Sequence, residues 1–278
     1  MSQKLLESQS KPKRRPRGVD SSTQSEISYR AQLRRIITEI RKDINSTLLP
    51  ELRKQQANFA DGYIADNFFS FIQSIIERNR RRWTGPEFES LATQLAGDFI
   101  RQTNEINGRR IQEDLRGFGI NFIDPDVRDY LDIAIQDNVR LIQSIPDRYL
   151  SQVEQIVATN VRSGNRAAVI QRALSAQFGA AQKRAALIAR DQTAKINGDL
   201  SARRQRAAGF THFRWVTSRD QRVRNRHDSL ANRNTKYGKG IYRFDSPPLS
   251  DSGQPILPGQ DYQCRCIAQP VLPSEINK

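Results

Sequence analysis

The sequence predicts a mainly α-helical protein that ends in a small α+β C-terminal domain. From Ile27 to about Gly209, apolar residues recur at three- and four-residue spacing with few interruptions, which is typical of helices with one buried face. Beyond Gly209, short alternating segments of aromatic and branched residues are separated by glycines and prolines, a pattern typical of strands and loops.

The first 26 residues are predicted to form a disordered basic arm. They are rich in Ser, Gln, Pro, Lys and Arg and contain few apolar residues, so folding them would bury little apolar surface. Five positive charges lie close together in this arm, on Lys11, Lys13, Arg14, Arg15 and Arg17. Such a segment suits contact with phosphate groups, and the alternative is a solvated tail without a fixed partner.

Residues 27–150 are predicted to form a helical domain with three apolar stripes. The first stripe contains Leu33, Ile36, Ile37, Ile40, Ile44 and Leu48. The second contains Phe68, Phe71, Ile72, Ile75 and Ile76, and the third runs through Leu91, Leu95, Phe99 and Ile106. Stripes with this spacing are typical of helix faces that pack into a core.

Four further helices are expected, over residues 124–144, 148–162, 166–177 and 180–208. Pro146 is expected to separate the first two and Gly179 the last two, because proline and glycine disfavour helix interiors. Strands are expected at 211–217, 241–244 and 264–271. We therefore predict a second domain over residues 151–272, followed by a tail at 273–278.

The formal net charge of +15 favours a polyanionic partner, most commonly nucleic acid. The charge is uneven: the net charge is −2 over residues 101–150, +7 over 151–210 and +6 over 211–245. This asymmetry favours a region that faces a polyanion over a charge that serves only solubility.

Cysteine usage and hydropathy indicate the cellular compartment in which the protein is made. Two cysteines separated by one residue do not make a disulfide framework, which favours a reducing environment. The N-terminal residues lack the apolar segment of a secretory signal, and no stretch has the apolar length needed to span a bilayer. We expect a soluble protein made in a cytoplasm, without a membrane partner.

The most specific pattern is an ordered series of motifs. It runs from the segment Trp215 to His227, through Pro247-Pro248, to Cys264-Arg265-Cys266. Together with the preceding segment Ala189 to Asn197, this series resembles the Mu F-like phage head-morphogenesis family over residues 160–272. The sequence departs from that family at Ala231, where a glycine is frequent, and at Leu257, where a histidine is frequent.

The resemblance implies a function in virion assembly. It implies a bacteriophage minor head protein, without enzymatic activity, that acts at the portal vertex and associates with DNA during packaging or delivery. The partners it implies are the phage portal protein, phage DNA and capsid or scaffold proteins. The implied location is the virion head, after assembly in the host cytoplasm.

A metal site is one interpretation of His227, Cys264 and Cys266. One imidazole and two thiolates can hold Zn²⁺, with His212 or a carboxylate such as Asp228 completing a tetrahedron. The spacing of the cysteines is not the usual zinc-knuckle spacing, and free cysteines are commonly buried in cores. We favour packed, metal-free side chains and no cofactor, with a structural zinc ion as the alternative.

Basic residues of the C-terminal half are candidates for non-specific DNA binding together with the arm. They are Arg203, Arg204, Arg206, Arg222, Arg224 and Arg226. The last three alternate, so an extended chain would place them on one face, for phosphate or for a structural bond to Asp220, Asp228 or Asp245.

Two other functions stay open. One is a metal-dependent nuclease that uses His227 with Asp228 or the cysteines. The other is a structural adaptor whose charge is incidental. Nucleophilic catalysis by Cys264 or Cys266 with His227 as base requires a proximity that the sequence does not show.

Overall fold

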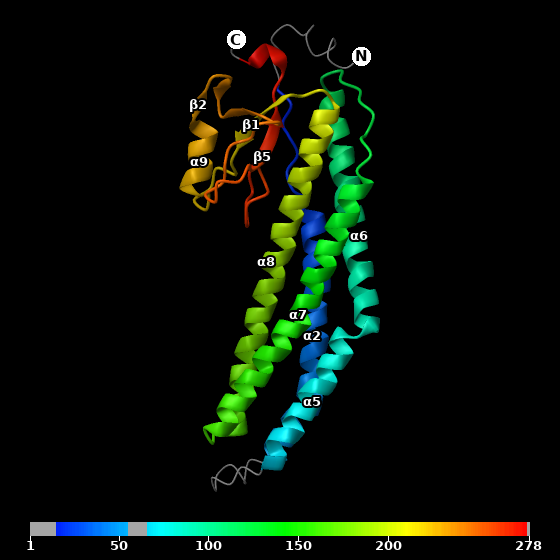
Figure 1. Cartoon of the computed structure of the whole chain (residues 1–278), viewed down its shortest axis with the longest axis vertical. Helices are drawn as coiled ribbons and strands as arrows, with labels where there is room; N and C mark the ends of the chain where they lie inside the picture. The colour runs from blue at the N-terminus through cyan, green and yellow to red at the C-terminus, as the bar shows by residue number, and fades with distance from the viewer. Residues whose placement is uncertain (1–14, 55–65, 277–278) are drawn as a thin grey trace. The chain divides into compact units, whose positions relative to one another are not determined.

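The computed structural model describes residues 15–54 and 66–276, and most of these residues are helical. The long helices are α2 (Thr23–Thr47), α5 (Asp66–Thr84), α6 (Pro86–Arg116), α7 (Arg128–Arg162) and α8 (Ala167–Ala207). Shorter helices are α3 (Leu49–Lys54), α9 (Asn225–Asn232) and a 3-10 turn, Pro273–Glu275. The predicted fold class, mainly helical with a small C-terminal sheet, is confirmed (Figure 1).

The chain divides into two compact units. The first unit comprises Met1–Glu26, Phe99–Ala134 and Arg190–Lys278, and the second comprises Ile27–Asp98 and Ile135–Ala189. Helices α6, α7 and α8 each contribute residues to both units. The units therefore do not follow the predicted division after residue 150, which falls inside α7.

The second unit is built on apolar helix faces. All six residues of the first predicted stripe are buried. In the second stripe Ile72, Ile75 and Ile76 are buried, whereas Phe71 is 42% exposed and the side chain of Phe68 lies outside the described residues. Leu91 of the third stripe is also exposed, because the buried face of α6 runs through Phe88, Ala92 and Ala96.

Two predicted helix breaks are wrong. Pro146 lies inside α7, and Gly179 lies inside α8. Ile142, Ile145 and Tyr149 are buried around the proline, so packing on both sides outweighs the loss of one helical hydrogen bond. At Gly179 the penalty relative to alanine is only about 1 kcal/mol, too little to end a long packed helix.

The first unit contains a three-stranded antiparallel sheet in the order β4-β1-β5. Its strands are β1 (His212–Val216), β4 (Ile241–Arg243) and β5 (Ile267–Pro270), and β1 pairs with both others. A second, two-stranded sheet joins β2 (Asn234–Thr235) to β3 (Gly238–Lys239). Figure 1 shows α8 leading into β1, while α9 packs on β1.

Aromatic side chains of the sheet form the core of this unit. Phe213 and Trp215 of β1 are almost fully buried, and the Phe213 ring contacts the rings of Tyr242 and Phe244. The predicted strand at 264–271 is shorter than expected, because it begins only at Ile267. Cys264 and Cys266 therefore lie in the segment that leads into β5.

The predicted disorder of residues 1–26 is wrong from residue 15 onward. The backbone N–H of Arg17 donates to Asp114, and the side chain of Gln269 donates to the carbonyl of Pro16 over 2.6 Å. Asn197 of α8 donates to the carbonyl of Val19, whose side chain is buried in the core. These hydrogen bonds hold residues 16–19 in place although the composition of the arm is polar. Lys11, Lys13 and Arg14 lie outside the described residues.

The hydropathy of the helices was compared with that of membrane-spanning helices. Within residues 15–54 and 66–276, no helix combines the length and the apolar character needed to cross a membrane.

Candidate metal centre

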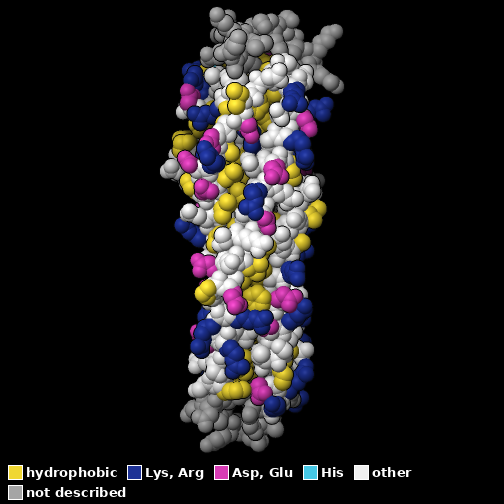
Figure 2. Space-filling view, turned by 90° about the vertical axis from the view of Figure 1, so that its right-hand side faces the viewer, with side chains coloured by type: hydrophobic (Ala, Val, Ile, Leu, Met, Phe, Trp, Pro, Cys, Tyr) yellow, Lys and Arg dark blue, Asp and Glu magenta, His cyan; other side chains and the backbone are white. Residues whose placement is uncertain are grey.

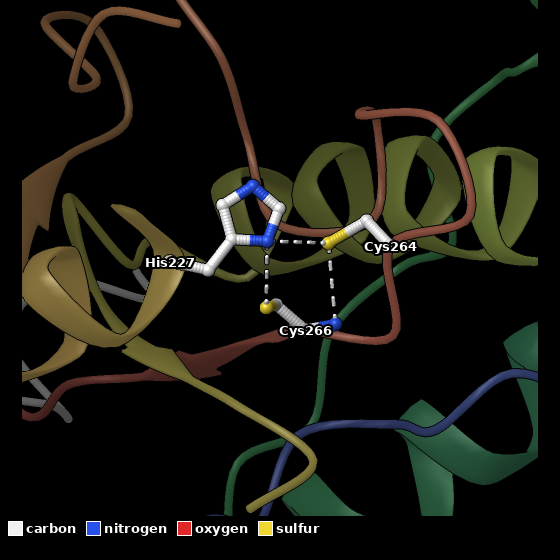
Figure 3. A group of neighbouring side chains, drawn as sticks. All are labelled: His227, Cys264 and Cys266. Carbon is white, nitrogen blue, oxygen red and sulfur yellow. Dashed lines mark hydrogen bonds between the residues drawn. The ribbon is translucent and has the colours of Figure 1, made fainter. Parts of the chain in front are cut away.

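Three side chains converge in the first unit, although His227 precedes Cys264 by 37 residues and Cys266 by 39 (Figure 3). His227 comes from the first turns of α9, and Cys264 and Cys266 come from the segment before β5. The Nδ1 atom of His227 lies 3.6 Å from each of the two sulfur atoms. All three side chains are buried, with 3 to 5% of their surface exposed.

A turn held by α8 positions the two thiols. The backbone N–H of Cys264 donates to the carbonyl of Asp261, and Gln263 between them has a positive φ of 54°. The N–H of Gln263 donates to the Asp191 carboxylate over 2.6 Å, and Arg190 donates to the Gln263 side chain. The N–H of Cys266 points at the Cys264 sulfur over 3.4 Å, which places both thiols beside the imidazole.

The imidazole of His227 is oriented from its other side. Its Nε2 atom lies 3.0 Å from Asp261 Oδ2, and the carboxylate of Asp261 also accepts a bond from Arg224 over 3.0 Å. The ring of Trp215 packs against the imidazole at a centroid distance of 5.5 Å. With the Nε2 proton held by Asp261, the lone pair of Nδ1 faces the two sulfur atoms.

The close approach of these groups changes their acidity. A hydrogen bond from the Cys266 thiol, assisted by the neighbouring His227, lowers the pKa of Cys264 below its ordinary value. The same coupling, together with burial, raises the pKa of Cys266. Hydrogen bonding to Cys264 and then to Asp261 raises the pKa of His227.

A basic pocket of about 130 Å³ adjoins the cluster. Besides His227 and the two cysteines, its lining includes the side chains of Arg190, Arg222, Arg224 and Arg265. Arg265, between the cysteines, forms an ion pair with Asp220 and thereby ties the loop after β1 to the cysteine segment. The cluster thus lies at a pocket with four arginines in its lining, of which Arg224 and Arg265 are paired with aspartates.

The predicted fourth ligands do not join the cluster. Asp228 is exposed, and His212 makes its bond with the hydroxyl of Thr211 and packs on the Tyr237 ring. The three residues His227, Cys264 and Cys266 form the one metal-ligating group found among the described residues. The sequence analysis did not identify Asp261 as the partner of His227. Its position three residues before Cys264, which is the spacing of a turn, could have indicated that it lies near the cysteines.

Comparison with known proteins finds one family that is similar over this site. Residues 151–269 match the family model described as phage Mu protein F like protein. Residues 151–269 are thus similar to that family. The match includes the complete cluster and ends on β5, so the matched segment extends from the second half of α7 to the sheet.

One curated relative aligns with nearly the whole chain. An uncharacterized protein of Haemophilus influenzae is 26% identical over 278 residues. That alignment covers 96% of this chain and 58% of the relative, so the chain spans a little over half of that protein's length. No solved structure matches the chain.

The arginines within residues 151–269 make different contacts, and one prediction among them is wrong. Arg204 is 1% exposed and cannot contact DNA, because its guanidinium binds Asp124, Asn104 and Asn107 in the interior of the first unit. The guanidinium of Arg203 lies over the Tyr130 ring, 4.5 Å from its centroid. Arg206 is exposed.

The alternating arginines after β1 do not share one extended face, because Arg226 lies in α9. Arg224 pairs with Asp261 and Arg226 with Asp251, neither of which was among the predicted partners. Arg222 is exposed, and its backbone N–H donates to Asp220 over 2.9 Å. In the arm, Arg15 pairs with Glu275, and Arg17 is exposed.

Proposed function

We propose that this chain is a minor head protein of a bacteriophage and contributes to head morphogenesis at the portal vertex. The observation that carries the proposal is the match of residues 151–269 to the Mu F-like family. The fold adds support, since the matched segment contains part of α7, the long helix α8 and a small sheet, elements that suit a structural component. Portal protein and capsid or scaffold proteins are the proposed partners.

The same protein is proposed to contact phage DNA without sequence preference. The net charge of +15 supports this, as do the exposed side chains of Arg17, Arg206 and Arg222. On the face shown in Figure 2, however, basic and acidic side chains interleave and do not gather into one basic patch. We therefore propose a contact made by the arm and a few exposed arginines, which gives modest affinity.

DNA binding is expected to weaken steeply with salt. Each phosphate contact contributes a slope of about −0.9 to the dependence of log K on log salt concentration, so about four contacts give a slope near −4. Fluorescence anisotropy of a labelled duplex at several salt concentrations measures this slope. Removing residues 1–14, or replacing Arg206 and Arg222 by Gln, should make the slope less negative.

The matched control is Arg226→Gln, which removes the same charge from a side chain already paired with Asp251. It should change the slope less than Arg222→Gln does. An affinity that stays constant between low and high salt would exclude the electrostatic contact. Incubating plasmid with the protein and Zn²⁺ or Mg²⁺ tests the nuclease alternative, and we expect the plasmid to stay intact.

A further inference from the structure

We infer that His227, Cys264 and Cys266 form a Zn²⁺ site that fastens α9 to the segment before β5. The inference does not depend on the proposed function in the phage head. It rests on the spacing of the three ligand atoms, on the groups that orient them and on the chemistry of the donor set.

The distances between the ligand atoms fit a tetrahedral zinc ion. With Zn–S of about 2.3 Å and Zn–N of about 2.0 Å, tetrahedral geometry separates sulfur from nitrogen by about 3.5 Å. Both observed distances from His227 Nδ1 to sulfur are 3.6 Å, and all three ligand atoms lie within 4.8 Å of one another. The imidazole nitrogen and the two sulfur atoms point toward one another (Figure 3).

Hydrogen bonding alone explains this arrangement less well. A neutral imidazole whose Nε2 proton is held by Asp261 has one lone pair on Nδ1, so it accepts a good hydrogen bond from only one thiol. Two sulfur atoms at equal distance from that nitrogen match ligands around a common centre.

The surroundings supply the supporting bonds that metal ligands require. A histidine ligand commonly donates its other ring N–H to a carboxylate, as His227 does to Asp261. The backbone N–H of Cys266 donates to the Cys264 sulfur, a bond that stabilises a thiolate. Thiolate and imidazole donors together favour zinc over magnesium or calcium, which prefer oxygen ligands.

A solvent molecule is the proposed fourth ligand. The described residues contribute three ligands to the group, and the adjoining arginine-lined pocket is open to water. Two thiolates balance the charge of Zn²⁺, so the neighbouring arginines do not oppose the site. The metal would join the eight-residue α9 to the segment before β5.

Metal analysis of the full-length chain tests this inference. Protein purified without chelator is expected to contain about one zinc ion per chain by elemental mass spectrometry. Cobalt exchanged into the site is expected to show the charge-transfer absorption of a cobalt–thiolate bond. His227→Asn and the double variant Cys264→Ser, Cys266→Ser should lose the metal, whereas the control His212→Asn, at the other buried histidine, should keep it.

If those variants fail to fold, the reactivity of the two thiols in the wild-type protein tests the inference instead. The wild-type chain has two cysteines, so a thiol reagent reports on this site alone. Both thiols should be protected in the zinc-loaded protein and become reactive when a chelator removes the metal. Folded protein that takes up no zinc or cobalt, with thiols equally reactive with and without zinc, would overturn the inference.

Discussion

Replacing Arg204 by Met is expected to lower the free energy of unfolding by about 2–4 kcal/mol, the largest effect of any single arginine that the structure describes. The guanidinium is buried and donates to Asp124 over 2.7 Å and 3.0 Å, to Asn107 over 2.7 Å and to Asn104 over 2.8 Å. Removing it leaves the two asparagines without this donor, while the half-exposed Asp124 carboxylate returns partly to water. Urea denaturation measures the change.

Arg206→Met is the control for this substitution, because it removes the same charge from an exposed position two residues further along α8. It should change the free energy of unfolding by less than about 0.5 kcal/mol. Equal effects of the two substitutions would show that Arg204 does not hold the first unit together.

Gly198→Ala is expected to destabilise the protein by about 1–3 kcal/mol, although alanine is the better helix former. A Cβ atom at Gly198 would lie 2.6 Å from the carbonyl oxygen of Pro258 and 3.4 Å from the Cα of Gly259. Both are backbone atoms, so the loop that leads to the cysteines must move to admit the methyl group. Thermal unfolding and thiol reactivity should both report the displacement.

Gly179→Ala in the same helix is the matched control. A Cβ atom there meets nothing within 4 Å, so the substitution should stabilise the protein by about 0.5–1 kcal/mol through helix propensity alone. If Gly198→Ala also proves stabilising, the close packing of α8 against the Pro258–Gly259 loop is not present in solution.

The long helices were predictable because their apolar spacing is a local property of the sequence. The stripe from Leu33 to Leu48 defines a buried face without reference to any other element. Helix α9 was not predicted, since its eight residues are mostly polar and its two buried side chains, His227 and Leu230, acquire partners only through the tertiary fold. Pro146 and Gly179 were misread for the same reason, because packing decides whether a helix passes through them.

The residue types of the site were identifiable from the sequence, but their geometry was not. His227, Cys264 and Cys266 could be grouped by chemistry, whereas the role of Asp261 depends on a turn in which Gln263 adopts a positive φ. The arginines show the same limit. Arg204 and Arg206 lie two residues apart on α8, and contacts with Asn104, Asn107 and Asp124, 80 to 100 residues away in sequence, distinguish the buried one from the exposed one.

The central claim is that this chain is a component of the phage head, and quantitative mass spectrometry of purified particles tests it most directly. Particles from a phage or prophage that carries the gene should contain a few copies of the protein, and particles made without it should be defective or poor in DNA. Complete absence of the protein from particles that are fully infectious would contradict the claim.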